Sequence, residues 1–237
     1  SADSPSSTIR FHSVHGLDHI LASITFGGHM NALIVVEHWS SCTKTCTSLK
    51  RDMATAYVLL EDALDWFDAV GSGPAQRLII YLSSDDDKAF NNKAIRALCA
   101  TRRIILETEP ARQSYKNSKH ETVIQDVKIG SAYVNAQGGG SDWAHGSSLV
   151  YFETVRNHYL TVGDRPAPPL AMLTNRRYDM QHMFPFLYEI YGADICLSND
   201  KSDPGRVKLY IINSFQSGVI AIDELEMKEH RLSRRQF

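Results

Sequence analysis

The period of apolar and polar positions changes several times along the chain, and each period predicts a type of element. Short apolar runs rich in β-branched residues predict buried strands over 31–37, 77–82 and 103–106. A weaker alternation over 9–15 and a small-residue run over 41–47 predict two more strands. Five strands are therefore expected before residue 107.

Helical spacing is clearest between residues 52 and 70, where apolar side chains recur every three or four positions. Ser48 is a candidate N-cap of this helix, and Gly71 and Gly73 are expected to end it. The same spacing predicts three further helices, over 90–101, from near Glu121, and over about 147–159. The resulting order, β-β-β-α-β-α-β-α-α, predicts a mixed sheet flanked by helices.

The last third of the chain has a different pattern. Residues 164–172 hold three of the eight prolines, which predicts a linker over 164–178. A short helix near 180–190 and strands over 193–198, 207–213 and 218–223, separated by turn residues, are expected next. The predicted organisation is a flexible leader (1–8), an α/β core (9–163), this linker, and a small antiparallel β-domain with a basic tail (179–237).

Composition and charge narrow the possible functions. The 25 Lys and Arg residues nearly balance the 27 Asp and Glu residues, whereas a dedicated nucleic-acid binder usually carries a basic excess. No apolar run approaches the roughly 20 residues that span a membrane, so no membrane partner is expected. The four cysteines do not have CxxC spacing and are expected to be reduced thiols: Cys42, Cys46, Cys99 and Cys196.

Two acids have a specific spacing. Asp85 follows a predicted buried strand, Glu121 opens a predicted helix, and 35 residues lie between them. Residues 85–92 (DDDKAFNN) and the triplet Val155-Arg156-Asn157 resemble segments of copia-type LTR-retrotransposon integrases. Tyr191-Gly192 resembles the entry to the small β-barrel of those proteins. The motifs occur in the same order, and the resemblance covers roughly residues 9–237.

The resemblance implies a ribonuclease-H-like core, like that of retroviral integrases, followed by a small C-terminal β-barrel. It also implies a site where three carboxylates hold two divalent cations for DNA strand transfer. Asp85 and Glu121 correspond to the second and third acids. Val14, in the segment 11–16 (FHSVHG), stands where the first is expected. Valine has no metal-ligating atom, so we expect the ancestral Mg²⁺ and the catalysis to be lost, with Asp85 and Glu121 at most a weak site for one cation.

Neighbouring residues offer limited replacements. Asp18 lies four positions after Val14, and Glu37 lies on the second predicted strand. His12, His15 and His19 form an H-x2-H-x3-H run, which as a zinc site would need a fourth ligand or an open position. Locally satisfied histidines are the simpler interpretation.

Basic residues form one cluster, which is either a solvated face or a remnant of a DNA-contacting surface, because phosphate contacts need Lys or Arg. Its members, with one more residue on the helix after Glu121, are Arg102, Arg103, Arg112, Lys116, Lys119 and Lys128. Trp66 and Phe67 are expected in the core. The resemblance implies that the helix over 52–70 can also supply a dimer surface.

The leading hypothesis is a domesticated, catalytically inactive integrase-like domain in the nucleus. It would bind protein partners, with or without DNA, in a chromatin or chromosome-maintenance complex, and it is compatible with a homodimer. One alternative is an active metal-dependent strand transferase or nuclease with an altered first acid. Another is a sequence-specific DNA-binding protein.

Overall fold

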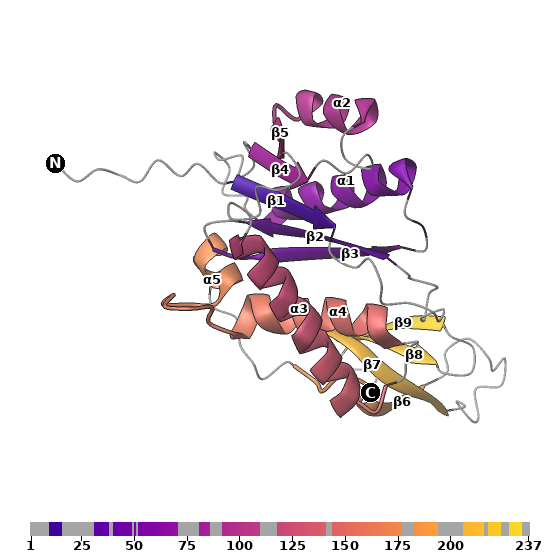
Figure 1. Ribbon diagram of the computed structural model, residues 1–237. Helices are drawn as coiled ribbons and strands as arrows, with labels where there is room; N and C mark the ends of the chain where they lie inside the picture. Colours follow the sequence, from indigo (N-terminus) through magenta and orange to yellow (C-terminus); the bar gives the residue numbers. More distant parts are fainter. Residues whose placement is uncertain are drawn as a thin grey trace.

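The protein is described from a computed structural model (Figure 1). The described residues are 10–15, 31–37, 40–48, 50, 52–70, 81–85, 92–109, 118–140, 144–176, 183–193, 206–215, 218–223 and 228–233. The predicted leader (1–8) lies outside them. For β1 and for most residues of β4 and β5, the backbone pairing is described but the side chains are not.

The first sheet is mixed and has five strands in the order β3-β2-β1-β4-β5. β1 (Arg10–His15), β2 (Asn31–Glu37) and β3 (Thr43–Ser48) pair antiparallel, whereas β4 (Tyr81–Asp85) and β5 (Ile105–Glu109) run parallel to β1. All five predicted strands are present, at bounds shifted by a few residues, so the mixed sheet is confirmed.

Helices cover both faces of this sheet (Figure 1). The helices α1 (Met53–Val70) and α2 (Lys93–Thr101) lie on one face and α3 (Ser118–Gln137) on the other, while α4 (His145–Tyr159) runs along the edge strand β3. β2 shows why both layers are needed. Leu33 and Val35 pack toward α1, while Ile34 and Val36 pack toward α3, because successive strand residues point to opposite faces.

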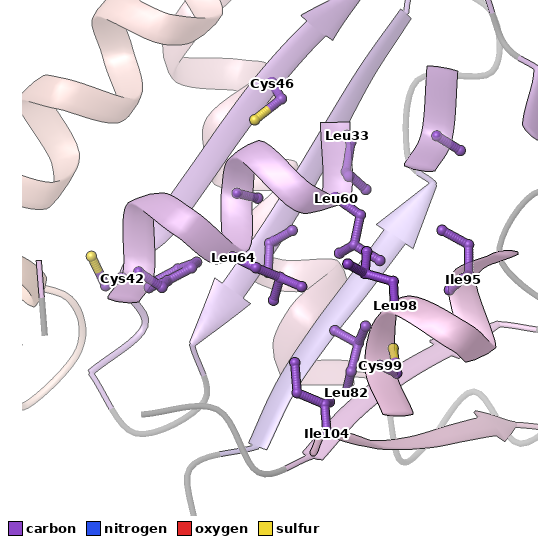
Figure 2. Close-up of a cluster of buried hydrophobic side chains, with 14 of the residues drawn as sticks. Leu33, Cys42, Cys46, Leu60, Leu64, Leu82, Ile95, Leu98, Cys99 and Ile104 are labelled. Atoms are coloured by element: carbon purple, nitrogen blue, oxygen red, sulfur yellow. The ribbon is translucent and has the colours of Figure 1, made fainter. Parts of the chain in front are cut away.

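The core on the α1 side is built from branched apolar side chains (Figure 2). Leu60 and Leu64 of α1 meet Leu82 of β4 and Ile95 of α2, and all four are fully buried. Phe67 is also fully buried, as expected, and Trp66 packs against this cluster. Cys42, Cys46 and Cys99 are free, buried thiols, in agreement with the predicted reduced state; Cys196 lies outside the described residues.

Two local expectations about helices were wrong. Ser48 does not cap α1, because it lies in β3; the carboxylate of Asp52 accepts a hydrogen bond from the Thr55 backbone N–H at 2.7 Å instead. Residues 183–190 do not form a helix. Leu187 has a φ of 56°, and its N–H donates to the Ile211 carbonyl at 2.6 Å, so this stretch is held beside a strand.

The segment predicted as a linker contains a short helix, α5 (Pro169–Thr174). Pro169 occupies its first position, where a missing N–H costs nothing. Leu170 is 3% exposed and belongs to the α1-side core. Residues 169–174 therefore pack with the first sheet.

The chain ends in a four-stranded antiparallel sheet in the order β6-β7-β8-β9, which confirms an antiparallel β-unit. Its strands are β6 (Glu189–Ala193), β7 (Arg206–Phe215), β8 (Gly218–Asp223) and β9 (Lys228–Ser233). β9 lies in the region expected to be a basic tail. Among the described pairings none joins β6 to β9, so closure into a barrel stays a prediction.

The second sheet packs against α4 (Figure 1). Tyr151 of α4, Phe186 and Ile212 form a shared buried cluster, and the Tyr151 hydroxyl donates to the Phe184 carbonyl at 2.7 Å. In the part of the chain that the structure describes, no helix is both long and apolar enough to cross a membrane.

Candidate functional site

The strand register places the two expected acid positions of the sheet side by side. β1 and β4 are adjacent and parallel, and their last described pair is Ser13 with Ser84. The next residues along this register are Val14 and Asp85. Val14, at the position where a first acid was expected, is therefore the strand neighbour of Asp85.

Glu121 comes to the same part of the sheet through α3. It lies in the first turn of that helix and is exposed. The next turn packs Val123 and Ile124 against Ile34 of β2, and Ile34 is the antiparallel partner of Val14. The backbone positions of Val14, Asp85 and Glu121 thus gather where α3 begins over the central strands.

The donor set at these positions does not fit a pair of bridged cations. Asp85 and Glu121 can supply carboxylate oxygens, which Mg²⁺ requires, but the valine side chain supplies none. Among the residues whose side chains the structure describes, no three His, Cys, Asp or Glu groups gather to hold a metal. The side chains of Asp85, His12 and His15 fall outside that description, as do Asp18 and His19.

Glu37 is not placed to replace the missing acid. It pairs with Phe11, three residues before Val14 on β1. Its buried carboxylate accepts hydrogen bonds from the backbone N–H and the hydroxyl of Ser40, so it closes the β2–β3 turn. A different carboxylate residue does neighbour Asp85, because Glu109 is its partner on β5.

The predicted basic cluster is only partly described. Arg102, at the end of α2, donates to Asp65 at 2.6 Å and to Asp68 at 3.3 Å, and it also lies 3.9 Å from Glu61. This guanidinium therefore joins α2 to α1, and its described contacts are intramolecular. Arg103 is exposed with a φ of 55°.

The remaining basic candidates give less information. Lys128 is half-buried on α3. Lys119 lies in the first turn of the same helix, but its side chain is outside the description. Arg112 and Lys116 lie outside the described residues. The structure therefore does not bring the six basic residues together as one described surface.

The Val155-Arg156-Asn157 triplet has a defined structural role at the edge of the first sheet. β3 is an edge strand, so the outward N–H and carbonyl of every second residue lack a strand partner. Asn157 accepts from the Thr43 N–H at 3.0 Å and donates to the Thr43 carbonyl at 2.6 Å. Its amide therefore acts as one more strand residue.

Sequence reasoning missed Glu153, which makes a second contact between α4 and β3. Its buried carboxyl accepts a hydrogen bond from the backbone N–H of Thr45, two residues along β3. The available signal was helical spacing, because positions 153, 156 and 157 share one face of α4. Burial raises the pKa of Glu153 to about 7, although Lys44, the Thr45 hydrogen bonds and Arg156 act to lower it.

Arg156 completes this buried polar layer. It is 2% exposed, and Nη1 donates to the Ser41 carbonyl at 2.6 Å. Its Nη2 has no hydrogen-bond partner among the described residues. Burial lowers the pKa of this guanidinium, and Asp126 acts in the opposite direction.

A groove of about 580 Å³ lies next to this layer. The first turns of α3 contribute Thr122, Val123 and Asp126 to its wall. The loop 162–165 after α4, Met172 of α5 and Ser41 form the rest. Thr122 directly follows Glu121, so the groove adjoins the position of the expected third acid.

Comparisons with known proteins support the fold. No protein-family model matches the chain, and no curated protein matches it in sequence. Solved structures do match. One is a chain of the simian T-cell lymphotropic virus intasome bound to the PP2A regulatory subunit B56 gamma, with a TM-score of 0.56 and 10% identity. That match covers 97% of this chain and 77% of the viral one.

Two isolated catalytic cores give similar results. The BIV integrase core matches with a TM-score of 0.51 and 14% identity, over 71% of this chain and 95% of that one. The HTLV-2 integrase core in complex with magnesium matches with a TM-score of 0.52 and 8% identity, over 68% and 93%. At these identities the likeness concerns the fold alone, and the chain has the ribonuclease-H-like fold of retroviral integrase catalytic cores.

Proposed function

We propose that this chain is a domesticated, catalytically inactive integrase-like domain. It descends from a copia-type retrotransposon and has a host role in the nucleus. Its work in this proposal is to bind protein partners in a chromatin or chromosome-maintenance complex. The observation that carries the proposal is that a valine occupies position 14, which follows Ser13 on β1 just as Asp85 follows its register partner Ser84 on β4.

Strand transfer needs charge stabilisation on both the attacking and the leaving oxygen, and in a two-metal site one carboxylate bridges the ions. Asp85 and Glu121 could hold a single cation weakly. Without an acid at position 14 to coordinate both ions, Asp85 and Glu121 cannot hold a second cation next to the first. The proposal therefore assigns no catalytic role to either acid.

Three observations favour a protein partner over DNA. Acidic and basic residues nearly balance, so the chain lacks the basic excess that a dedicated nucleic-acid binder usually carries. The guanidinium of Arg102 is engaged by acids of α1. In addition, one structural neighbour is a chain of a viral intasome solved in complex with the PP2A regulatory subunit B56 gamma, which supports a protein partner for a domain of similar fold.

The test is a strand-transfer and nicking assay in Mg²⁺ and Mn²⁺. The purified chain is expected to show no activity above background, and Asp85→Ala is expected to change nothing. The matched variant Val14→Asp supplies the missing acid and tests whether metal binding returns, as measured by calorimetry. Robust activity of the natural chain that Asp85→Ala abolishes would overturn the proposal.

The main alternative is an active enzyme with a different third carboxylate. Glu109 favours this candidate, because it is the register partner of Asp85. An Asp85, Glu109 and Glu121 set would make the natural chain active and make Glu109→Gln inactive. The same assay therefore separates the two functions.

The second alternative is sequence-specific DNA binding through the basic residues at 102–119. It requires an affinity that falls steeply as salt rises, because bound Lys and Arg displace counterions. A filter-binding series between about 50 and 200 mM salt would reveal it. The neutral charge balance makes weak, flat binding the expected result.

A further inference from the structure

We propose that the groove between α3, α5 and the loop 162–165 binds a peptide segment of a protein partner. The segment that fits combines basic, acidic and apolar side chains. This inference rests on the proposed function, because it names the surface and the partner chemistry of an interaction module.

The charged groups of the groove wall are available to a ligand. Asp126 and Asp164 are exposed, and Arg165 is half-buried. No hydrogen bond or ion pair joins any of the three to another described residue. A ligand charge could therefore pair with them without first breaking a described hydrogen bond or ion pair, although Asp126 also interacts electrostatically with the buried Arg156.

Apolar side chains also line the groove. Val123, Val162 and Met172 line it, and methionine adapts its shape to different partners. A volume of about 580 Å³ falls within the range of ligand sites and exceeds the size of one side chain. These dimensions suit a few consecutive residues of a peptide.

Arg156 is the reason to expect an acidic side chain in the bound peptide as well as a basic one. Its buried guanidinium bonds the carbonyl of Ser41, a wall residue, and interacts electrostatically with Asp126 and Arg165. One guanidinium nitrogen has no hydrogen-bond partner among the described residues, so this buried cation keeps one unused donor close to the wall residue Ser41. An acidic group of the ligand near Arg165 would complement it.

The same pattern disfavours nucleic acid at this groove. A phosphate backbone is negative throughout, and it would face Asp126 and Asp164, with Arg165 as the one cationic side chain among the described residues of the wall. Glu121 adds another exposed carboxylate one residue before the groove. A peptide with alternating charge avoids this repulsion.

The experiment selects peptides from a phage-displayed random library on the immobilised full chain. Enriched peptides are then synthesised, labelled and titrated by fluorescence anisotropy. They are expected to combine basic, acidic and apolar residues. Their affinity should fall at least about tenfold in the double variant Asp126→Asn/Asp164→Asn. Arg165→Gln tests the acidic contact separately.

The control is Asp62→Asn, which removes an exposed carboxylate of α1 on the opposite side of the first sheet. It should leave the affinity unchanged, and thermal melts should show all variants folded. Failure to enrich any peptide would overturn the inference, as would equal binding to the double variant or displacement by a DNA duplex. None of these outcomes would contradict the proposed loss of strand-transfer activity. Activity in that assay would instead overturn the proposed function, whatever the groove binds.

Discussion

At the scale of single residues, Glu153 occupies an environment in which carboxyl groups are rarely found. It is a buried carboxyl, and it accepts a hydrogen bond from the backbone of an edge strand. Lys44 of β3 and Arg156 of its own helix lie close enough to lower its pKa, yet burial outweighs them and raises the pKa to about 7. Its protonation state therefore depends on whether the chain is folded.

We expect Glu153 to make the fold less stable as pH rises. Between its ordinary pKa of 4.5 and about 7, the folded chain keeps a proton that the unfolded chain has released. Its stabilising contribution is complete below pH 4.5 and is lost as pH rises through 7. The free energy of unfolding of Glu153→Gln, relative to that of the natural chain, should therefore rise by on the order of 3 kcal/mol between pH 4.5 and pH 8.

Urea denaturation of both proteins at several pH values measures this difference. Glutamine keeps an oxygen that can accept the Thr45 N–H, so the comparison isolates ionisation. If the two stability curves stay parallel across this pH range, Glu153 does not titrate with the fold.

At the scale of elements, α4 acts as a cover for the open edge of the first sheet. Edge strands expose backbone groups that can pair with other chains. Here Asn157 satisfies both outward groups of Thr43, and Glu153 satisfies the N–H of Thr45. Helix α4 is thus fixed to β3 by polar contacts that replace a sixth strand.

Replacing Asn157 by alanine should weaken this edge. The change leaves the Thr43 N–H and carbonyl buried without their partner, which costs roughly 2–4 kcal/mol. Chemical denaturation measures the loss. We also expect faster hydrogen exchange at Thr43 than at central strand β2.

The control for Asn157→Ala is Thr154→Ala on the same helix. The Thr154 hydroxyl donates to the Val150 carbonyl within α4 and leaves no strand group unpaired. This variant should change stability by less than about 1 kcal/mol. Equal losses in the two variants would show that the contact with β3 is not what Asn157 contributes.

At the scale of the whole molecule, the alternating and helical periods predicted the mixed sheet and its flanking helices, because strong amphipathic patterns are local signals. They did not predict the contact partners. Pro169 and its neighbours suggested a linker, but Leu170 is buried in the first core. Residues near 180–190 were expected to form a helix, but Leu187 and Tyr188 exchange backbone hydrogen bonds with Ile211 of β7. Both errors arose because long-range packing decided the local conformation.

The candidate site shows the same division. The sequence could predict that Val14, Asp85 and Glu121 belong together only through the resemblance, since spacing alone does not specify strand order. The register then supplies the adjacency of Val14 and Asp85. The groove was not foreseeable, because its wall comes from Ser41, the start of α3 and a loop that follows α4.

Because α4 contacts both sheets, we expect the two sheets to unfold together. One side of this helix holds β3, and the other packs Tyr151 against Phe186 and Ile212, with the two aromatic rings 5.3 Å apart. Phe186→Ala removes the centre of that cluster and should cost about 3–5 kcal/mol. If the two sheets open together, it should speed hydrogen exchange by similar factors at Ile211 and Ile212 of β7 and at Ile34 of β2.

In the natural chain, amides of β7 and β2 should exchange at similar rates, governed by one global opening. Faster exchange throughout β7 in the natural chain would mean that the second sheet opens independently and that α4 does not couple the two. The outcome bears on the proposed function. Coupled sheets would hold the groove, α4 and the C-terminal sheet in one fixed arrangement, so that a partner contacting both would bind a pre-organised surface without the entropy cost of ordering it.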